Sequence, residues 1–333
     1  MFDDTSHVRN EQYTGEEPTT AFFRGPDGIS VNLACGPDPE MIYQLLYAFL
    51  QSTWSPHPLD PGDYADTPEE REYIRRAFEG KTLPQALEGL SFWFQVDGVT
   101  RACTHQLVRT RIGCAVMQHG GRDNDWRHRS FSIPETVART RGLENCITDE
   151  KPIRQYLREV ESNFSDAGDL EVAVCNHVER SKRLYAAMVD AGIPYQDARR
   201  ILPIGTQTHI SLIYTWPALQ NMLSKRLEHQ MDWEMNCVAQ LMVREVCMKC
   251  DPLLGENLRS GSDRAKRDMF ADMDLVTPPG KWPCNEIQKH RPRVMRPEQN
   301  PFWILAPESF QPGSEVRWIP TNGVWPEEVS RDR

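Results

Sequence analysis

The sequence of 333 residues predicts an α/β or α+β fold in which helices outnumber strands. In residues 90–96 (LSFWFQV), apolar side chains at every second position share one face, which predicts a half-buried strand. Residues 207–214 are also β-like. Residues 171–191 and 215–250 have helical spacing instead, over lengths that strands seldom reach.

The N-terminal third begins with a polar segment, residues 1–25, which we expect to be flexible. Helical apolar spacing predicts a helix over residues 41–50. A second helix is predicted to begin at Thr67, because proline follows it and Glu70 lies three residues on, as in a capping box. The strand that begins at residue 90 is expected to end at Asp97-Gly98.

The middle of the chain is predicted to continue with a short helix over residues 100–109 and an irregular segment that contains three glycines, Gly113, Gly120 and Gly121. Two helices are expected to follow, over residues 151–163 and 171–191. The second should be closed by Gly192.

One long helix is predicted from the Thr215-Trp216-Pro217 start signal to about Cys250, where Pro252 stops it. Beyond this point Pro, Trp and charged residues dominate with little periodicity. We therefore divide the chain into the N-terminal segment, a main domain over residues 26–254, and a Pro/Trp-rich extension over residues 255–333 that packs as loops and short pieces.

The charge balance disfavours a nucleic-acid polymer as partner, since 48 Asp+Glu against 38 Lys+Arg give a net charge of −10. A mononucleotide remains possible, because a few arginines can hold one phosphate. No apolar run reaches the roughly 18 residues of a membrane span, and the N-terminus lacks a secretory leader pattern. Nine thinly spread cysteines are typical of reduced thiols, so a cytoplasmic protein is expected.

The first segment with chemical character is residues 101–113, RACTHQLVRTRIG. Arg101, His105 and Arg109 share one helical face, and such close cations repel one another unless an anion lies among them. Arg109 and Arg111 flank the helix end before a glycine-containing loop, which suits a phosphate or a dianionic nucleotide. A solvated or salt-bridged arginine face is the alternative.

The second such segment is residues 197–234. Arg199 precedes the β-like run, and Asn221, Arg226 and Glu234 lie in the helix that follows. Taken alone, this pattern also fits an amphipathic core helix with ordinary surface charges.

Together, the two segments resemble the flavin-dependent thymidylate synthases, the ThyX family. Residues 90–112 (LSFWFQVDGVTRACTHQLVRTRI) are similar to the family's strand, helix and Gln-x-x-Arg-His-Arg run, which opens the signature RHRxxSxNExSxR. The second segment matches without a gap through Leu202-Pro203, Thr208, Asn221, Arg226 and Trp233-Glu234. Phe131-Ser-Ile-Pro134 also resembles the family sequence after the signature, so the resemblance covers about residues 85–250.

The resemblance implies an antiparallel or mixed sheet flanked by helices, with a long C-terminal core helix. Residues 26–254 would be the catalytic domain, and the protein would be a homotetramer with active sites at subunit interfaces. The implied reaction is C5-methylation of a uridine nucleotide, of the dUMP to dTMP type. FAD, NADPH and 5,10-methylenetetrahydrofolate are the implied cofactors.

The resemblance also implies roles for single residues, carried over by position. The implied substrate-binding residues are Gln106, Arg109, Arg122, Arg199 and Arg226. The implied flavin-binding residues are Arg109, Thr110, Arg111 and Asn221. Arg226, on the pyrimidine ring, and His119, aligned with the second signature serine, are the catalytic candidates.

The signature itself departs from the family pattern. Thr110 replaces the middle histidine, Cys114 the first serine, and Val116-Met117 the Asn-Glu pair, while Arg122 falls one position late. Outside it, the chain has Gly89 and Thr215 where the family has a histidine and an asparagine. Two alternatives follow: a different pyrimidine nucleotide (UMP or dCMP, with a methyl or hydroxymethyl product), or a catalytically silent, nucleotide-binding paralogue.

We expect no metal site. A Cys₃His zinc site formed by Cys247, Cys250, Cys284 and His290 is the alternative, because Cys247-x-x-Cys250 has zinc-ligand spacing. The second pair is loosely spaced after a long intervening stretch, so buried thiols are the simpler interpretation.

Overall fold

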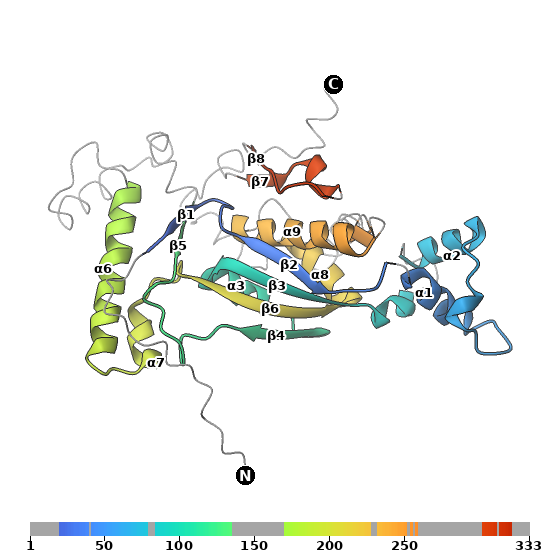
Figure 1. The fold of residues 1–333 in the computed structure, drawn as a ribbon, viewed down its shortest axis with the longest axis horizontal. Coiled ribbons are helices and arrows are strands. Elements are labelled where there is room, and N and C mark those ends of the chain that lie inside the picture. Colours follow the sequence, from blue (N-terminus) through green and yellow to red (C-terminus); the bar gives the residue numbers. More distant parts are fainter. Residues whose placement is uncertain are drawn as a thin grey trace, which may run out of the picture.

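The fold is built around one antiparallel sheet with helices on one face and at both ends, as the computed structural model in Figure 1 shows. The structure describes residues 20–39, 41–78, 84–134, 170–227, 232–251, 254–255, 257–258, 302–311 and 313–321. The helix predicted over residues 151–163 lies outside these ranges. No helix in these ranges is long and apolar enough to cross a bilayer.

The sheet has the order β2-β3-β6-β4, and each neighbouring pair is antiparallel. Its strands are β2 (Ser30–Cys35), β3 (Ser91–Thr100), β6 (Gln207–Thr215) and β4 (Cys114–Gln118). Both predicted strands are therefore confirmed, and the central pair places Phe94 opposite Leu212. β4 was not predicted, because it lies in the glycine-containing segment expected to be irregular.

The predicted end of β3 at Asp97-Gly98 is wrong, because the strand continues to Thr100 through a register shift between Val96 and Val99. Gly98 makes the irregularity possible. Its φ is +74°, and a Cβ there would lie 1.8 Å from the carbonyl oxygen of Gly28. Only glycine fits this close approach of two backbones.

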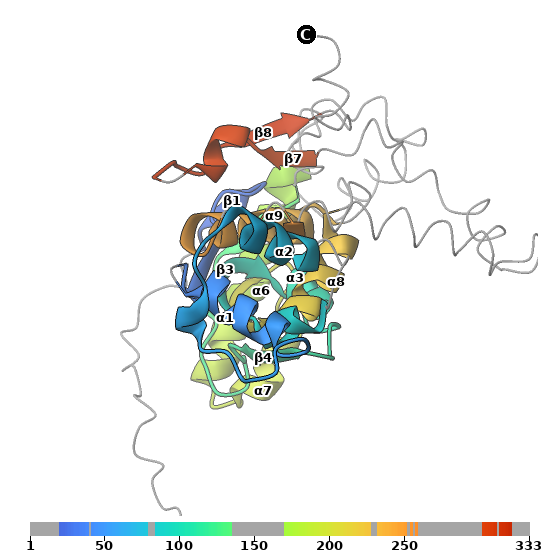
Figure 2. The ribbon, with the colours of Figure 1, turned by 90° about the vertical axis from the view of Figure 1, so that its right-hand side faces the viewer.

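One face of the sheet is covered by α3 (Arg101–Leu107), α8 (Trp216–Arg226) and α9 (Trp233–Lys249) (Figures 1 and 2). Apolar side chains of these helices and of β3 and β6 form one continuous core. On the opposite face, Trp93 and Ile213 are paired across the strands and remain 41% and 45% exposed. The sheet thus has a covered face and an exposed one, on which these two apolar side chains lie.

The single long helix predicted over residues 215–250 is wrong, because two helices occupy this span. α8 ends with Leu227 as its C-cap. α9 begins after Asp232, whose carboxylate accepts hydrogen bonds from the amides of Glu234 and Met235, at 3.1 and 3.3 Å. A strong N-cap inside an otherwise helical stretch explains the division.

A helical lobe extends the molecule at the end where β3 begins (Figure 1). It contains α1 (Ile42–Gln51), η1 (Pro61–Asp63), α2 (Pro68–Phe78) and η2 (Pro84–Gly89). The predicted capping box of α2 is present: the Thr67 hydroxyl accepts from the Glu70 amide at 3.2 Å, and the Glu70 carboxylate accepts from the Thr67 amide at 2.9 Å.

At the other end of the molecule, β1 (Phe22–Arg24) pairs in parallel with β5 (Phe131–Ile133), next to α6 (Leu170–Asp190). The segment 1–25 that we expected to be flexible therefore includes a strand, while residues 1–19 lie outside the described residues. α6 confirms the helix predicted over 171–191, and Gly192 follows it with a φ of +85°. After it come α7 (Tyr195–Ala198) and η4 (Arg199–Ile201).

The C-terminal extension contributes a hairpin of β7 (Phe302–Leu305) and β8 (Trp318–Thr321), with η6 (Pro307–Phe310) between the strands. It lies on α9, as Figures 1 and 2 show. Gln240 of α9 donates to the carbonyl of Trp303 (2.7 Å) and accepts from the amide of Leu305 (2.8 Å). These bonds satisfy the edge of β7 and fix the hairpin to the helix.

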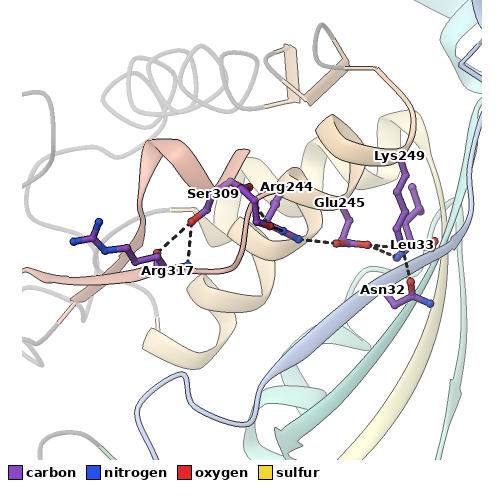
Figure 3. A network of polar contacts seen from close by, with 8 residues as sticks. Asn32, Leu33, Arg244, Glu245, Lys249, Ser309 and Arg317 are labelled. Carbon is purple, nitrogen blue, oxygen red and sulfur yellow. Dashed lines mark hydrogen bonds and ion pairs between the residues drawn. The ribbon is translucent and has the colours of Figure 1, made fainter. Parts of the chain in front are cut away.

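A polar network continues from the hairpin through α9 to β2 (Figure 3). The Arg244 guanidinium donates to the carbonyl of Ser309 (2.8 Å) and to the Glu245 carboxylate (3.0 Å). Glu245 in turn accepts from the Leu33 amide (3.0 Å) and pairs with Lys249 (2.8 Å). The network joins segments from both ends of the chain.

Candidate functional site

Two of the predicted substrate-binding residues, far apart in the sequence, meet at the C-terminal ends of α3 and α8. The Arg226 guanidinium donates from Nη1 to Oε1 of Gln106 at 3.0 Å, across 120 positions of sequence. The Arg226 carbonyl accepts from the Asn236 side chain at 3.1 Å, which links the end of α8 to α9. The contact therefore has a firm base on three helices.

α3 owes its position to Glu234, at the start of α9. The Glu234 carboxylate is 3% exposed and accepts from the Thr100 amide (2.6 Å) and the Thr100 hydroxyl (2.5 Å). The same hydroxyl caps α3 by accepting from the Cys103 amide at 3.1 Å. Burial raises the pKa of Glu234 to about 7, against the opposing effect of the two Thr100 bonds.

Glu234 is a positioning residue, and its role was not predicted from the sequence. It stood in the Trp233-Glu234 part of the second segment, and no spacing rule connects it to Thr100. Only the packing of α9 against the end of β3 brings the two together.

The predicted flavin-binding residues lie on the loop after α3 and on the exposed side of α8. Arg109 and Arg111 are exposed, and no ion pair to a carboxylate of the described residues holds either one. The loop then turns at Gly113, whose carbonyl accepts from the Thr215 amide at 2.8 Å. Since Thr215 is the N-cap of α8, this bond fixes the loop to the helix that carries the exposed Asn221.

A second group of predicted residues gathers around Trp126, beyond the end of β4. His119 stacks on Trp126 with ring centroids 5.8 Å apart and planes at 10°. The amide of His119 donates to the His209 carbonyl at 3.1 Å, so the pairing of β4 with β6 fixes its backbone. The Arg129 guanidinium also contacts this ring, with Nη2 at 3.3 Å from each ring nitrogen of His119.

His119 is neutral in this environment. Burial lowers its pKa to about 4, and the charges of Arg129 and His209 act in the same direction. A neutral imidazole can accept or donate a hydrogen bond, but it cannot serve as a cationic acid near pH 7. The predicted catalytic position is thus better suited to orienting a ligand than to protonating one.

Arg199 reaches the same tryptophan from η4. A Cβ on Gly121 would lie 3.0 Å from the Trp126 ring and 3.3 Å from Cδ of Arg199, so glycine permits this close packing. Arg101 lies over the Trp126 ring, with Cζ 5.8 Å from its centroid. Burial, followed by the charge of Arg199, lowers the pKa of Arg101.

The structure therefore divides the predicted residues into two groups. The first comprises Gln106, Arg109, Thr110, Arg111, Asn221 and Arg226, at the end of α3 and on α8. The second comprises His119, Arg199 and the neighbouring Arg122, which is exposed and lies 3.7 Å from Asp123. Trp126 and Arg129, in the second group, were not predicted, because the run Arg127-His128-Arg129 is not followed by the Asn-Glu pair of the family signature.

The structure describes only two of the four residues of the zinc alternative. Cys247 is half-buried and Cys250 buried at the end of α9, whereas Cys284 and His290 lie outside the described residues. Within the described part of the chain, no three His, Cys, Asp or Glu side chains are arranged to hold a metal ion.

Comparison with known proteins identifies relatives of this chain and of its fold. A family model described as "Thymidylate synthase complementing protein" matches residues 40–252. The flavin-dependent thymidylate synthase of Pyrococcus furiosus is 27% identical over 168 residues, which are 50% of this chain and 58% of that protein. The enzyme of the same name from Geobacter sulfurreducens is 30% identical over 162 residues, 48% of this chain and 58% of that one. The matched region thus spans little more than half of these relatives.

Among solved structures, the UMP/dUMP methylase PolB from Streptomyces cacaoi bound with 5-Br dUMP is similar, with a TM-score of 0.53. It is 20% identical and covers 70% of this chain and 96% of its own, so the likeness concerns the fold. The family match spans both groups of site residues, from Gln106 to Arg226. The chain is therefore a divergent member of the thymidylate synthase complementing protein family, the ThyX family of flavin-dependent thymidylate synthases.

Proposed function

We propose that this protein methylates C5 of a uridine nucleotide reductively, using FAD, with 5,10-methylenetetrahydrofolate as carbon donor and NADPH as reductant. The observation that carries the proposal is the 3.0 Å hydrogen bond between Arg226 and Gln106. Both were assigned to the nucleotide by resemblance, and they come from segments 120 positions apart.

Arg226 is suited to a pyrimidine ring. Its guanidinium is half-buried and oriented by the Gln106 amide, and it presents a planar set of donors to ring carbonyl oxygens. Partial desolvation strengthens such hydrogen bonds. Because Gln106 already orients the Arg226 guanidinium, this donor can stabilise the negative charge that develops on the ring carbonyl oxygens during the reaction.

The loop after α3 fits a flavin dinucleotide. Arg109 and Arg111 are exposed cations, Thr110 supplies a hydroxyl between them, and the Asn221 amide is exposed on the adjoining helix. Guanidinium groups suit the two phosphates of FAD, and an amide suits the polar edge of its ring. When bound, the flavin supplies the reducing equivalents, while these side chains bind and orient it.

The second group of residues suits the phosphate of the nucleotide. Arg199 and Arg122 flank Gly121, and Arg101 lies close enough to Arg199 for their charges to interact. An anion between them relieves this repulsion. We assign His119 to the same end of the substrate, as a neutral hydrogen-bonding group.

The identity of the nucleotide is the main alternative within this proposal. The solved relative is named as a UMP/dUMP methylase, so ribose and deoxyribose are both reasonable, and dCMP with a methyl or hydroxymethyl product is a further candidate. Because Thr110 and Cys114 depart from the family signature, a catalytically silent nucleotide-binding paralogue is the alternative of a different class.

We further propose a cytoplasmic homotetramer. The exposed apolar row on the sheet supports an oligomer: Trp93 faces Ile213 across β3 and β6, and Ala115 of β4 is paired with the same isoleucine. Apolar surface of this kind is often covered by another subunit. Size measurement in solution tests this part.

The first experiment is a titration of the purified protein with FAD, followed by the visible flavin spectrum. Binding with a perturbed spectrum supports the proposal, whereas a folded protein that binds no flavin favours the silent paralogue. The second is the affinity for dUMP, UMP and dCMP in Arg226→Ala. We expect it to fall at least about tenfold, as is typical for loss of a charged hydrogen-bond donor. Lys225→Ala, at the neighbouring exposed position, is the matched control.

A further inference from the structure

α6 carries a lysine whose surroundings none of the proposed roles explains. Lys182 is 1% exposed, and its ammonium group has no hydrogen-bond partner among the residues that the structure describes. Its position, four residues after Val178 and three before Tyr185, places it on the buried face of the helix. Burial lowers its pKa to about 8, and the charge of Arg129 adds to this effect. A buried cation without a partner is costly unless something else completes its site.

Two other buried donors lack a partner among the described residues and lie on segments close to α6, because the Trp126 amide donates to the Tyr185 hydroxyl at 3.0 Å and β5 packs against the helix. They are Nε1 of Trp126 and Nε2 of Gln207. The turn that contains Arg129 connects them: its amide donates to the Trp126 carbonyl (3.1 Å), and the Gln207 amide donates to the Ser130 carbonyl (2.9 Å). Buried donors are almost always paired, so three that have no partner in the described part of the chain require an explanation.

The neighbouring carboxylates do not supply the missing acceptor. Asp125 accepts from Arg127 at 2.7 Å, and Asp190 accepts from the same guanidinium at 2.9 Å. Arg129 has instead the neutral His119 ring as its neighbour, at 3.3 Å. The region thus combines two cations and two neutral donors.

We propose that Lys182 and Arg129, with the side-chain N–H groups of Trp126 and Gln207, form a buried site for a phosphoryl group. A phosphoryl dianion matches the two positive charges and offers three terminal oxygens to the four donors. A carboxylate has one charge and would leave a buried cation uncompensated. Arg129 and Ser130 are partly exposed, which provides the opening of the site.

Trp126 and Arg129 also belong to the second group of residues described above, whereas Lys182 and Gln207 are assigned to neither the nucleotide nor the flavin. The site does not rest on the proposed function, because its occupant is defined by the donors alone. The phosphoryl group can come from free phosphate or from a nucleotide, and competition between the two probes distinguishes these sources.

The test measures thermal unfolding of the full chain with increasing inorganic phosphate, at constant ionic strength set with chloride. We expect phosphate to raise the melting temperature of the wild type. Lys182→Met fills the same space without a charge, so it should melt higher than the wild type without phosphate and bind phosphate at least about tenfold more weakly. Arg183→Gln, which removes an exposed charge from the same helix, is the matched control and should behave as wild type.

Arg129→Gln provides a second variant, which should also weaken phosphate binding at least about tenfold. If phosphate stabilises Lys182→Met as much as it stabilises Arg183→Gln, the site does not exist. If UMP and phosphate compete, the phosphoryl group is that of the nucleotide; if their stabilising effects add, the site takes a separate anion. The assay contains no flavin, so a protein that fails to bind FAD can still pass it, and Lys182→Met should bind FAD as the wild type does.

Discussion

Replacing Glu234 by glutamine should remove the part of the pH dependence of folding stability that this buried carboxyl group causes. The carboxylate is buried and holds the Thr100 amide and hydroxyl. Glutamine keeps both contacts, since its oxygen can accept from the amide and its NH₂ group can donate to the hydroxyl oxygen. The variant therefore removes the titration while it preserves the geometry.

The sign and size of the effect follow from the two pKa values. The carboxyl has a pKa of 4.5 in the unfolded chain and about 7 in the folded one, so the folded state binds more protons between these values. Stability is then fully present below pH 4.5 and falls as pH rises through 7. At about 1.36 kcal/mol for each unit of pKa, the loss amounts to about 3 kcal/mol.

His119 changes stability in the opposite direction. Its pKa is lowered from 6.5 to about 4, so the unfolded state binds more protons between these values, and stability rises with pH there. The two groups therefore oppose each other in the wild type. Only the difference between the wild type and Glu234→Gln isolates the carboxyl group.

The assay is urea unfolding at pH 5, 6, 7 and 8, in the wild type and in Glu234→Gln. We expect the free energy of unfolding of the variant, relative to that of the wild type, to increase by about 2–3 kcal/mol from pH 5 to pH 8, because the rest of the total loss falls below pH 5. Glu69→Gln, which changes an exposed carboxyl on α2, should leave the difference constant. Parallel pH curves for the wild type and Glu234→Gln would refute the reasoning, because the carboxyl would then titrate alike in both states.

Three other predictions concern the backbone, the hairpin and the imidazole. Gly98→Ala should lower the free energy of unfolding by more than about 3 kcal/mol, because its Cβ would collide with the Gly28 carbonyl. Gly192→Ala has the same backbone strain but no obstruction, so it should lower the free energy of unfolding by about 1 kcal/mol. Equal losses in thermal unfolding would contradict this. Gln240→Leu should lower the free energy of unfolding by about 1–3 kcal/mol, because it removes the hydrogen bonds to the Trp303 carbonyl and the Leu305 amide of β7. It should also make the hairpin sensitive to limited proteolysis, and a cleavage pattern identical to that of the wild type would contradict this. The His119 imidazole should titrate near pH 4 in an NMR pH series, and a midpoint above 6 would show that the ring is not buried as described.

Local signals in the sequence were sufficient for elements whose periodicity and caps agree. The capping box at Thr67 and the alternation in residues 90–96 led directly to α2 and β3. The division between α8 and α9 was not predictable from apolar spacing, because that spacing continues through Asp232 and only the N-cap geometry ends it. β4 was hidden because its partner, β6, lies about 100 positions later in the sequence.

For the site, the resemblance identified residues that the fold brings together, such as Gln106 and Arg226. It could not find the residues that position them. Glu234 acts on Thr100 through a buried contact between distant segments, and Trp126 contacts His119 and Arg101 through its ring rather than through a motif. Contacts of this kind arise from packing, which a linear pattern does not encode.

The hairpin that covers α9 is synthesised later than the helix itself, and this order has a consequence for the nascent chain. The ribosome releases α9 well before the strand that covers it, since Gln240 and its partner Trp303 are 63 positions apart. A nascent chain that has completed the sheet and its helices still lacks the acceptors and donors that β7 and η6 bring to α9. A polypeptide ended prematurely would keep that helix uncovered and available to chaperones and proteases. A fusion partner is therefore better attached at a site that leaves the hairpin free to dock on α9.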